Sequence, residues 1–158
     1  SLTAMQATSV FATIANDGVK VSPTVIAGTS DAQGRFTPVK RDRTGVRVIS
    51  AETAKTMRLM MESVVTPNGT APTAAIKGYR VAGKTGTSRI VGPNGYMHNH
   101  HNAIFAGMAP VSCPRLVVVA YINDPKKISY YGATVAGPLF AKVMADALQI
   151  LNVPTEGN

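Results

Sequence analysis

Residues 78–87 read GYRVAGKTGT, and this stretch fits two motifs that carry different chemistry. Counted from Gly78, it matches G-x-x-x-x-G-K-T, in which loop amides and the start of a following helix hold a phosphate group. Counted from Lys84, it gives K-T-G-T, which fits a β-strand at the edge of a sheet. Residues 69–77 are rich in turn formers, and residues 85–95 contain three glycines and a proline where a phosphate-binding loop needs a helix. The sequence therefore favours a strand.

The residue types from Lys84 to Thr87 suit an extended substrate that ends in a carboxylate. Lys84 offers a positive charge, and the hydroxyl groups of Thr85 and Thr87 are possible donors to a carboxylate. Gly86 removes a side chain where the substrate backbone has to come close. The amide N–H of Thr87 is a candidate donor to a developing oxyanion. The alternative is an exposed strand with a solvated lysine, since K-T-G alone is only three letters.

The surrounding patterns predict an α+β fold in which an antiparallel sheet is packed by helices. Near-helical spacing of apolar residues predicts a helix over residues 2–16, which Asp17-Gly18 ends, and a helix over residues 50–65, with Ser50 as the N-cap. Residues 29–45 have the composition of a surface loop or a small hairpin. Three extended runs predict an antiparallel meander, over residues 79–87, 102–111 and 115–123.

A last helix is predicted from Pro138 onward, because proline is tolerated in a first helical turn and an apolar stripe follows it. The stripe contains Phe140, Val143, Met144, Ala147, Leu148 and Leu151.

The composition is that of one globular domain with a basic surface. The chain has 158 residues, 45% of them hydrophobic, and a formal net charge of +8, which favours anionic partners. Its single cysteine, Cys113, cannot form an internal disulfide and is interpreted as a packing residue. No apolar run approaches the roughly 20 residues of a membrane span, so any export signal or anchor is expected outside this chain.

Several stretches together resemble one family. SLTAMQATSVFATIANDGVKVSP near the start, VAGKTGTSR, IFAGMAP, VVVAYINDP and YYGATVAGPLFAKVM occur in order and at suitable spacing. They look like the C-terminal part of the transpeptidase domain of a class B penicillin-binding protein, most closely the members that act at the division septum. The resemblance covers essentially the whole chain and implies the penicillin-binding transpeptidase fold, which serine β-lactamases share.

The resemblance implies a serine-type peptidoglycan D,D-transpeptidase that cross-links stem peptides and is acylated and inhibited by β-lactams. Lys84, Thr85, Gly86 and Thr87 would be the third active-site motif of the family. Arg89 would lie at the mouth of the cleft. Tyr130, Tyr131 and Gly132 match a loop that walls the cleft in the family, and ordinary loop packing is the alternative for the two tyrosines.

Two family motifs are missing from residues 1–158. No serine in this chain begins an S-x-x-K, which would carry the nucleophile, or an S-x-N. The resemblance places both motifs upstream, so the chain is expected to be the C-terminal portion of a transpeptidase domain that is not catalytic without the rest of the protein. A non-catalytic β-lactam sensor and a serine β-lactamase are the alternative functions, and a nucleotide-binding P-loop domain is the third.

Partners and location are also implied by the resemblance. Peptidoglycan stem peptides, β-lactam antibiotics, the N-terminal part of the same protein and proteins of the division machinery are expected partners, with no cofactor and no nucleic acid. The complete protein is expected in the inner membrane, with a single-pass anchor and a periplasmic catalytic domain. The sequence MHNHHN contains His98, His100 and His101, which we expect to be loop histidines near a cleft rather than metal ligands. KRDRTGVR, at residues 40–47, is interpreted as a solvated loop.

Overall fold

The computed structural model describes residues 2–40, 44–127 and 129–156, and it has the predicted α+β fold. Three strands form an antiparallel sheet in the order β3-β4-β5, and β1 and β2 form a separate two-stranded hairpin. The elements in chain order are α1 (Ala4–Ala15), β1 (Gly28–Ser30), β2 (Phe36–Pro38), α2 (Ala51–Glu62), the 3₁₀ turns η1 (Ser63–Val65) and η2 (Pro72–Ala74), β3 (Ala82–Gly92), β4 (Gly95–Ala109), β5 (Leu116–Asn123), α3 (Gly132–Val135) and α4 (Gly137–Ile150).

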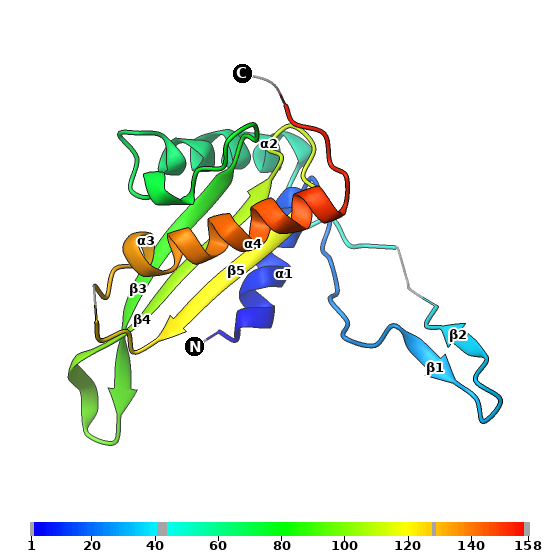
Figure 1. Cartoon of the computed structure of the whole chain (residues 1–158), viewed down its shortest axis with the longest axis horizontal. Helices are drawn as coiled ribbons and strands as arrows, with labels where there is room; N and C mark the ends of the chain where they lie inside the picture. The colour runs from blue at the N-terminus through cyan, green and yellow to red at the C-terminus, as the bar shows by residue number, and fades with distance from the viewer. Residues whose placement is uncertain (1, 41–43, 128, 157–158) are drawn as a thin grey trace.

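The sheet is the middle of three layers. Figure 1 shows α4 crossing one face of the sheet, with α1 behind the opposite face and the β1–β2 hairpin extending away from the body. Successive side chains of β4 point to opposite faces of the sheet, so this strand contributes to both cores. Phe105 and Ala109 pack into the cluster under α4, whereas Met108 packs toward α1. A helix layer on each face therefore fixes the register of the strands between them.

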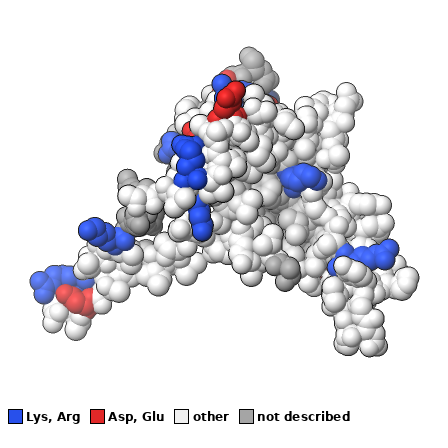
Figure 2. Space-filling view, turned by 180° about the vertical axis from the view of Figure 1, so that it is seen from behind, with Lys and Arg blue, Asp and Glu red and all other residues white. Residues whose placement is uncertain are grey.

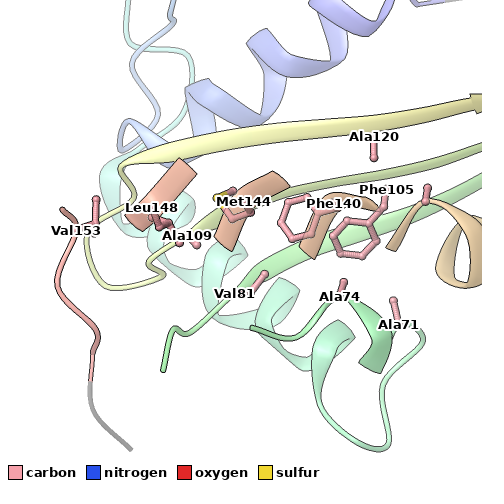
Figure 3. Close-up of a cluster of buried hydrophobic side chains, with 11 residues drawn as sticks. Ala71, Ala74, Val81, Phe105, Ala109, Ala120, Phe140, Met144, Leu148 and Val153 are labelled. Carbon is pink, nitrogen blue, oxygen red and sulfur yellow. The ribbon is translucent and has the colours of Figure 1, made fainter. Parts of the chain in front are cut away.

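The larger core cluster lies between the sheet and α4. Phe140, Met144 and Leu148, spaced four residues apart on α4, are fully buried there (Figure 3). The rings of Phe105 and Phe140 have centroids 4.6 Å apart and an interplanar angle of 52°, a tilted contact that aromatic pairs favour. Burial of each phenylalanine side chain contributes roughly 1.5–3 kcal/mol to folding. The layer under α4 thereby holds the strands in place.

The first two helices form where they were predicted, but two of their ends differ. The first helix, α1, starts at Ala4 rather than at residue 2, and α2 ends at Glu62, where the 3₁₀ turn η1 follows, rather than at residue 65. Thr3 caps α1 in a capping box with Gln6, and Ser50 accepts a hydrogen bond from the Thr53 N–H at the start of α2. After α1 the chain turns at Asp17-Gly18, where both residues have positive φ. Local sequence chemistry is sufficient for these features because each one depends on residues within four positions of the helix end.

Arg58 is buried on the inner face of α2, a position where the sequence suggested only apolar residues. Its side chain donates to the Ile14 carbonyl oxygen at 3.0 Å and to Asp17 Oδ1 at 2.7 Å. The guanidinium is therefore hydrogen-bonded at the carboxyl end of α1, where a positive charge also complements the helix dipole. The side chain ties the two helices together.

Two of the three strands, β3 and β4, extend further toward the hairpin between them than predicted. The β3–β4 hairpin closes around Pro93 and Asn94, with Gly95 at φ 107°, so β4 begins seven residues before the predicted residue 102. Two predictions of buried residues were wrong, and part of one predicted loop falls outside the described residues. Val143 and Leu151 are exposed because the buried stripe of α4 repeats every four residues, and Cys113 is an exposed thiol. Part of KRDRTGVR, residues 41–43, lies outside the described residues.

No helix within residues 2–40, 44–127 and 129–156 combines the length and the apolar character that a membrane crossing requires.

Candidate active site

The K-T-G-T sequence lies on β3, at the edge of the sheet. Within the described residues β3 pairs with β4 and with no other strand. Residues 82–92 are a strand, so the helix that a phosphate-binding loop needs after Lys84 is not formed and the P-loop interpretation is wrong. The Lys84 side chain is exposed and its Nζ donates to the Thr85 carbonyl oxygen at 2.9 Å. The motif therefore presents a cation and an open strand edge.

Gly86 has no steric role inside this chain. A Cβ built on Gly86 would meet only Ile104 Cβ, at an ordinary contact distance of 3.7 Å. Its φ also lies outside the left-handed region that favours glycine. At Gly83, in contrast, a Cβ would lie 2.4 Å from Phe105 Cζ. The internal packing thus explains the glycine at 83 and not the one at 86.

Thr87 connects β3 to the loop that contains the two tyrosines. Its Oγ1 accepts a hydrogen bond from the Gly132 N–H at 3.1 Å. Gly132 itself is buried, and a Cβ there would lie 2.3 Å from the Ile104 carbonyl oxygen and 2.6 Å from that of Gly86. Only glycine allows α3 to start this close to the backbones of β3 and β4. The predicted motif and the predicted loop are therefore in direct contact, and Thr87 keeps its hydroxyl proton for another acceptor.

The two tyrosines form an aromatic group with a histidine from β4. Tyr130 and Tyr131 are 41% and 55% exposed, and their ring centroids lie 4.4 Å apart. The Tyr130 hydroxyl donates to the Tyr131 hydroxyl at 3.1 Å, and this hydrogen bond raises the pKa of Tyr130 above its ordinary value. The ring of His101 stacks on Tyr130 with centroids 4.3 Å apart and an interplanar angle of 17°. The sequence placed His101 near a cleft but gave no sign of its contact with Tyr130.

The register between β3 and β4 explains why His101 lies close to the predicted cleft residue Arg89. Arg89 on β3 pairs with His101 on β4, so the predicted residue of the cleft mouth and the aromatic group are neighbours in the sheet. The strand pairing that connects them forms only in the folded sheet, and the sequence offered no signal for it beyond a histidine close to a hairpin. Printed contacts thus connect the strand to the tyrosine loop at Thr87, Arg89 and His101, whereas Lys84, Thr85 and Gly86 precede these residues on β3.

The basic charge is not concentrated in one place on the face opposite to that of Figure 1. Figure 2 shows Lys and Arg side chains of the described residues separated over this face, with acidic side chains next to some of them. Nucleic-acid binding favours a continuous basic stripe or a basic helix. Among the described residues, this face therefore lacks a continuous basic stripe.

His98, His100 and His101 lie on β4, so the expectation that they are loop histidines was wrong. Among the described residues, no group of three or more His, Cys, Asp or Glu side chains is arranged to hold a metal ion. His100 instead lies 2.7 Å from Asp124, measured from Nδ1 to Oδ2. Asp124 is 24 residues away in sequence, which is why the local sequence around the histidines showed no acidic partner.

The chain is similar in sequence to known transpeptidases. A model of the penicillin-binding protein transpeptidase domain matches residues 1–145. The chain is 39% identical to the penicillin-binding protein PbpB of Mycolicibacterium smegmatis over 98% of its own length and 25% of the relative. It is 40% identical to the peptidoglycan D,D-transpeptidase FtsI of Escherichia coli over 86% of its own length and 24% of that protein. The chain spans about a quarter of the length of these curated relatives.

Solved structures agree with this similarity. Penicillin-binding protein 3 of Mycobacterium tuberculosis, in its ampicillin complex, superposes with a TM-score of 0.87 at 36% identity. That match covers 99% of this chain and 36% of the other. The transpeptidase domain of Burkholderia pseudomallei penicillin-binding protein 3 superposes with a TM-score of 0.77 at 35% identity and covers 99% of this chain and 45% of that one. The fold and the sequence thus point to the same proteins.

Proposed function

Because this chain belongs to the penicillin-binding protein transpeptidase domain family, we propose that it contributes the carboxylate-binding strand and an aromatic wall to the active site of a peptidoglycan D,D-transpeptidase. The observation that carries the proposal is the position of K-T-G-T on an edge strand, joined to the tyrosine loop by the hydrogen bond between Thr87 and Gly132. An extended peptide can add to such an edge while side chains hold its terminus.

In the proposed reaction a serine hydroxyl attacks the carbonyl carbon of the penultimate D-Ala of a stem peptide. The serine ester forms, the peptide bond to the terminal D-Ala breaks, and that D-Ala leaves with the proton. Lys84 and the hydroxyls of Thr85 and Thr87 hold the terminal carboxylate, and the Thr87 N–H stabilises the oxyanion. An amine from a neighbouring strand then displaces the serine. β-Lactams acylate the same serine, because their carboxylate and amide resemble the end of the peptide.

We further propose that the S-x-x-K serine and the S-x-N motif come from a part of the protein outside residues 1–158. Neither motif occurs in this sequence. An apolar groove of about 630 Å³, with Val10, Ile14, Val48 and Met57 among its lining residues, also runs between α1 and α2. An exposed groove lined by apolar side chains suits contact with further protein.

In this proposal the complete protein works at the division septum with other division proteins, anchored in the inner membrane and facing the periplasm.

The role of Lys84 is tested by Lys84→Ala in the complete protein. Loss of one charge-assisted contact to a carboxylate corresponds to roughly 1.5–3 kcal/mol, so we expect acylation by ampicillin to slow by roughly 10- to 100-fold. The rate is measured by mass spectrometry of samples quenched at increasing times. Lys142→Ala, an exposed lysine on α4, is the matched control. Acylation of Lys84→Ala at the same rate as the control would contradict the assignment.

A further inference from the structure

The ladder between β3 and β4 is interrupted beside the aromatic group. Arg89 pairs with His101, but the next pair is Val91 with Tyr96, so one residue of β3 faces four residues of β4. Asn99, within this bulge, has a φ of 59°. Bulged residues have no partner in the strand ladder, so their position depends on other contacts. His101, which stacks on Tyr130, is the first residue after this irregular segment.

Asp124 holds the bulge in place. It directly follows β5, and its N–H donates to the His101 carbonyl oxygen at 2.9 Å. Its Oδ2 lies 2.7 Å from His100 Nδ1, and Lys126 Nζ lies 3.2 Å from the same nitrogen. One residue thus contacts both the backbone of His101 and the side chain before it.

Asp124 also holds the loop on the other side of the aromatic stack. Its Oδ1 is shielded from solvent and forms an ion pair with Lys126 Nζ at 2.8 Å. The two atoms are not aligned for a hydrogen bond. The same ammonium group donates to the Asn99 carbonyl oxygen at 3.2 Å. Lys126 is four residues before Tyr130. Asp124 and Lys126 therefore connect the β4 bulge to the loop that carries the tyrosine.

The carboxylate form of Asp124 is favoured in this setting. Contact with Lys126 lowers the pKa of Asp124, partial burial raises it, and His100 lowers it again, with a lowered pKa as the result. The charge that both contacts need is thus present across the neutral range. Asp124 also has a φ of 49°, a conformation that aspartate and asparagine tolerate better than most residues.

We infer that Asp124 is a positioning residue that fixes the His101–Tyr130 ring pair as one wall of the acyl-donor site. Asp124 acts through the rings and is separate from Lys84 and Thr87 on β3. This inference rests on the proposed transpeptidase function. It predicts that Asp124 governs the recognition of apolar groups on the substrate or inhibitor and leaves the acyl-transfer step itself unchanged.

The test compares Asp124→Asn with Asp146→Asn in the complete protein. Asparagine keeps the positive φ and the backbone donor but removes the charge that Lys126 and His100 contact, and Asp146 is an exposed carboxylate on α4. Acylation is measured with ampicillin, which carries an aromatic side chain, and with 6-aminopenicillanic acid, which lacks one. We expect Asp124→Asn to weaken the apparent binding of ampicillin roughly tenfold with an unchanged limiting rate, and to change the other compound less than about twofold.

A second readout does not depend on activity. The ring protons of Tyr130, assigned by NMR with Tyr130→Phe, are expected to be shifted by the stacked His101 ring. Asp124→Asn and Lys126→Met should each reduce this shift, and Asp146→Asn should leave it unchanged. An unchanged Tyr130 shift in both variants would overturn the positioning role, as would an equal loss of acylation with both compounds. Failure of the unsubstituted protein to react with either compound would instead overturn the proposed function, and the NMR shift would still decide the role of Asp124.

Discussion

Gly86 is a residue whose identity the packing of this chain does not explain, and the proposed substrate does explain it. A methyl group at this position meets only Ile104 at an ordinary distance, so Gly86→Ala should leave the free energy of unfolding within about 0.5 kcal/mol of the original. The same methyl group would project where the backbone of an extended substrate has to approach. We therefore expect Gly86→Ala to slow acylation by ampicillin at least about tenfold, measured as adduct formation against time.

The control for Gly86 is the neighbouring glycine at position 83. A methyl group there collides with the ring of Phe105, so Gly83→Ala should lower stability by roughly 1–3 kcal/mol in urea unfolding. The two variants separate a requirement of the fold from a requirement of the substrate. A fully active Gly86→Ala protein would show that no substrate backbone comes close to this position.

Single residues differ in how far the sequence could predict them. Lys84 to Thr87 were proposed as site residues from the sequence alone, because their chemistry is contained in four consecutive letters. Asp124 and His101 were not, because their roles depend on a contact between strands that are distant in sequence. Arg58 was missed for a related reason, since its partners lie on α1. Residues that act through tertiary contacts leave no local pattern.

At the scale of elements, the segment after α4 forms hydrogen bonds with residues at one end of the sheet. The Tyr79 hydroxyl donates to the Val153 carbonyl oxygen at 2.7 Å. Glu156 accepts from the Arg80 N–H at 2.9 Å, from the Ser112 N–H at 3.2 Å and from the Ser112 hydroxyl. The contacts join residues just before β3 to the turn between β4 and β5. The K-T-G-T strand is therefore anchored at the end opposite to its hairpin.

Glu156→Gln should weaken this anchor in a pH-dependent way. Burial raises the pKa of Glu156, but hydrogen bonds from Ser112 and from the Arg80 N–H outweigh it, so the pKa lies below its ordinary value of 4.5. A lowered pKa means that the carboxylate stabilises the fold above the unfolded value and that this stabilisation is lost as the pH falls through the folded value. We expect Glu156→Gln to cost about 1 kcal/mol near pH 7 and less at acidic pH.

The measurement for Glu156 is urea unfolding of both proteins at a series of pH values, with Asp146→Asn as the control. The difference in stability between the original and Glu156→Gln should be constant above about pH 6 and should shrink as the pH drops below the ordinary glutamate pKa. A difference that grows on acidification would contradict the assigned contacts.

The longer helices and the three strands of the main sheet were predicted in type and order from local patterns, whereas the short helix α3 was predicted as part of a loop. The Ser50 cap and the turn at Asp17-Gly18 depend on nearby residues, so the start of α2 and the end of α1 were predicted from the sequence, whereas the Thr3 cap of α1 was not. The start of β4 could not be predicted, because residues 95–101 extend along β3 through cross-strand pairing and a bulge rather than through an apolar alternation of their own. Strand ends are set by the partner strand.

At the scale of the whole molecule, the two faces of the sheet differ in how completely they are covered. The face under α4 has the larger buried cluster, whereas the face toward α1 has a small cluster and the apolar groove between α1 and α2. Met5 and Val10 on α1 are exposed. This asymmetry accords with a chain that spans about a quarter of its relatives and with the proposal that more of the same protein completes the domain.

The central claim is that this chain binds the substrate while a serine elsewhere in the protein reacts with it. Intact-mass spectrometry of the complete protein after brief incubation with ampicillin, followed by peptide mapping, tests this most directly. The account predicts one ampicillin adduct per protein, on a serine outside residues 1–158 that lies in an S-x-x-K sequence. An adduct on a serine within residues 1–158, or a folded complete protein that forms no adduct, would contradict it.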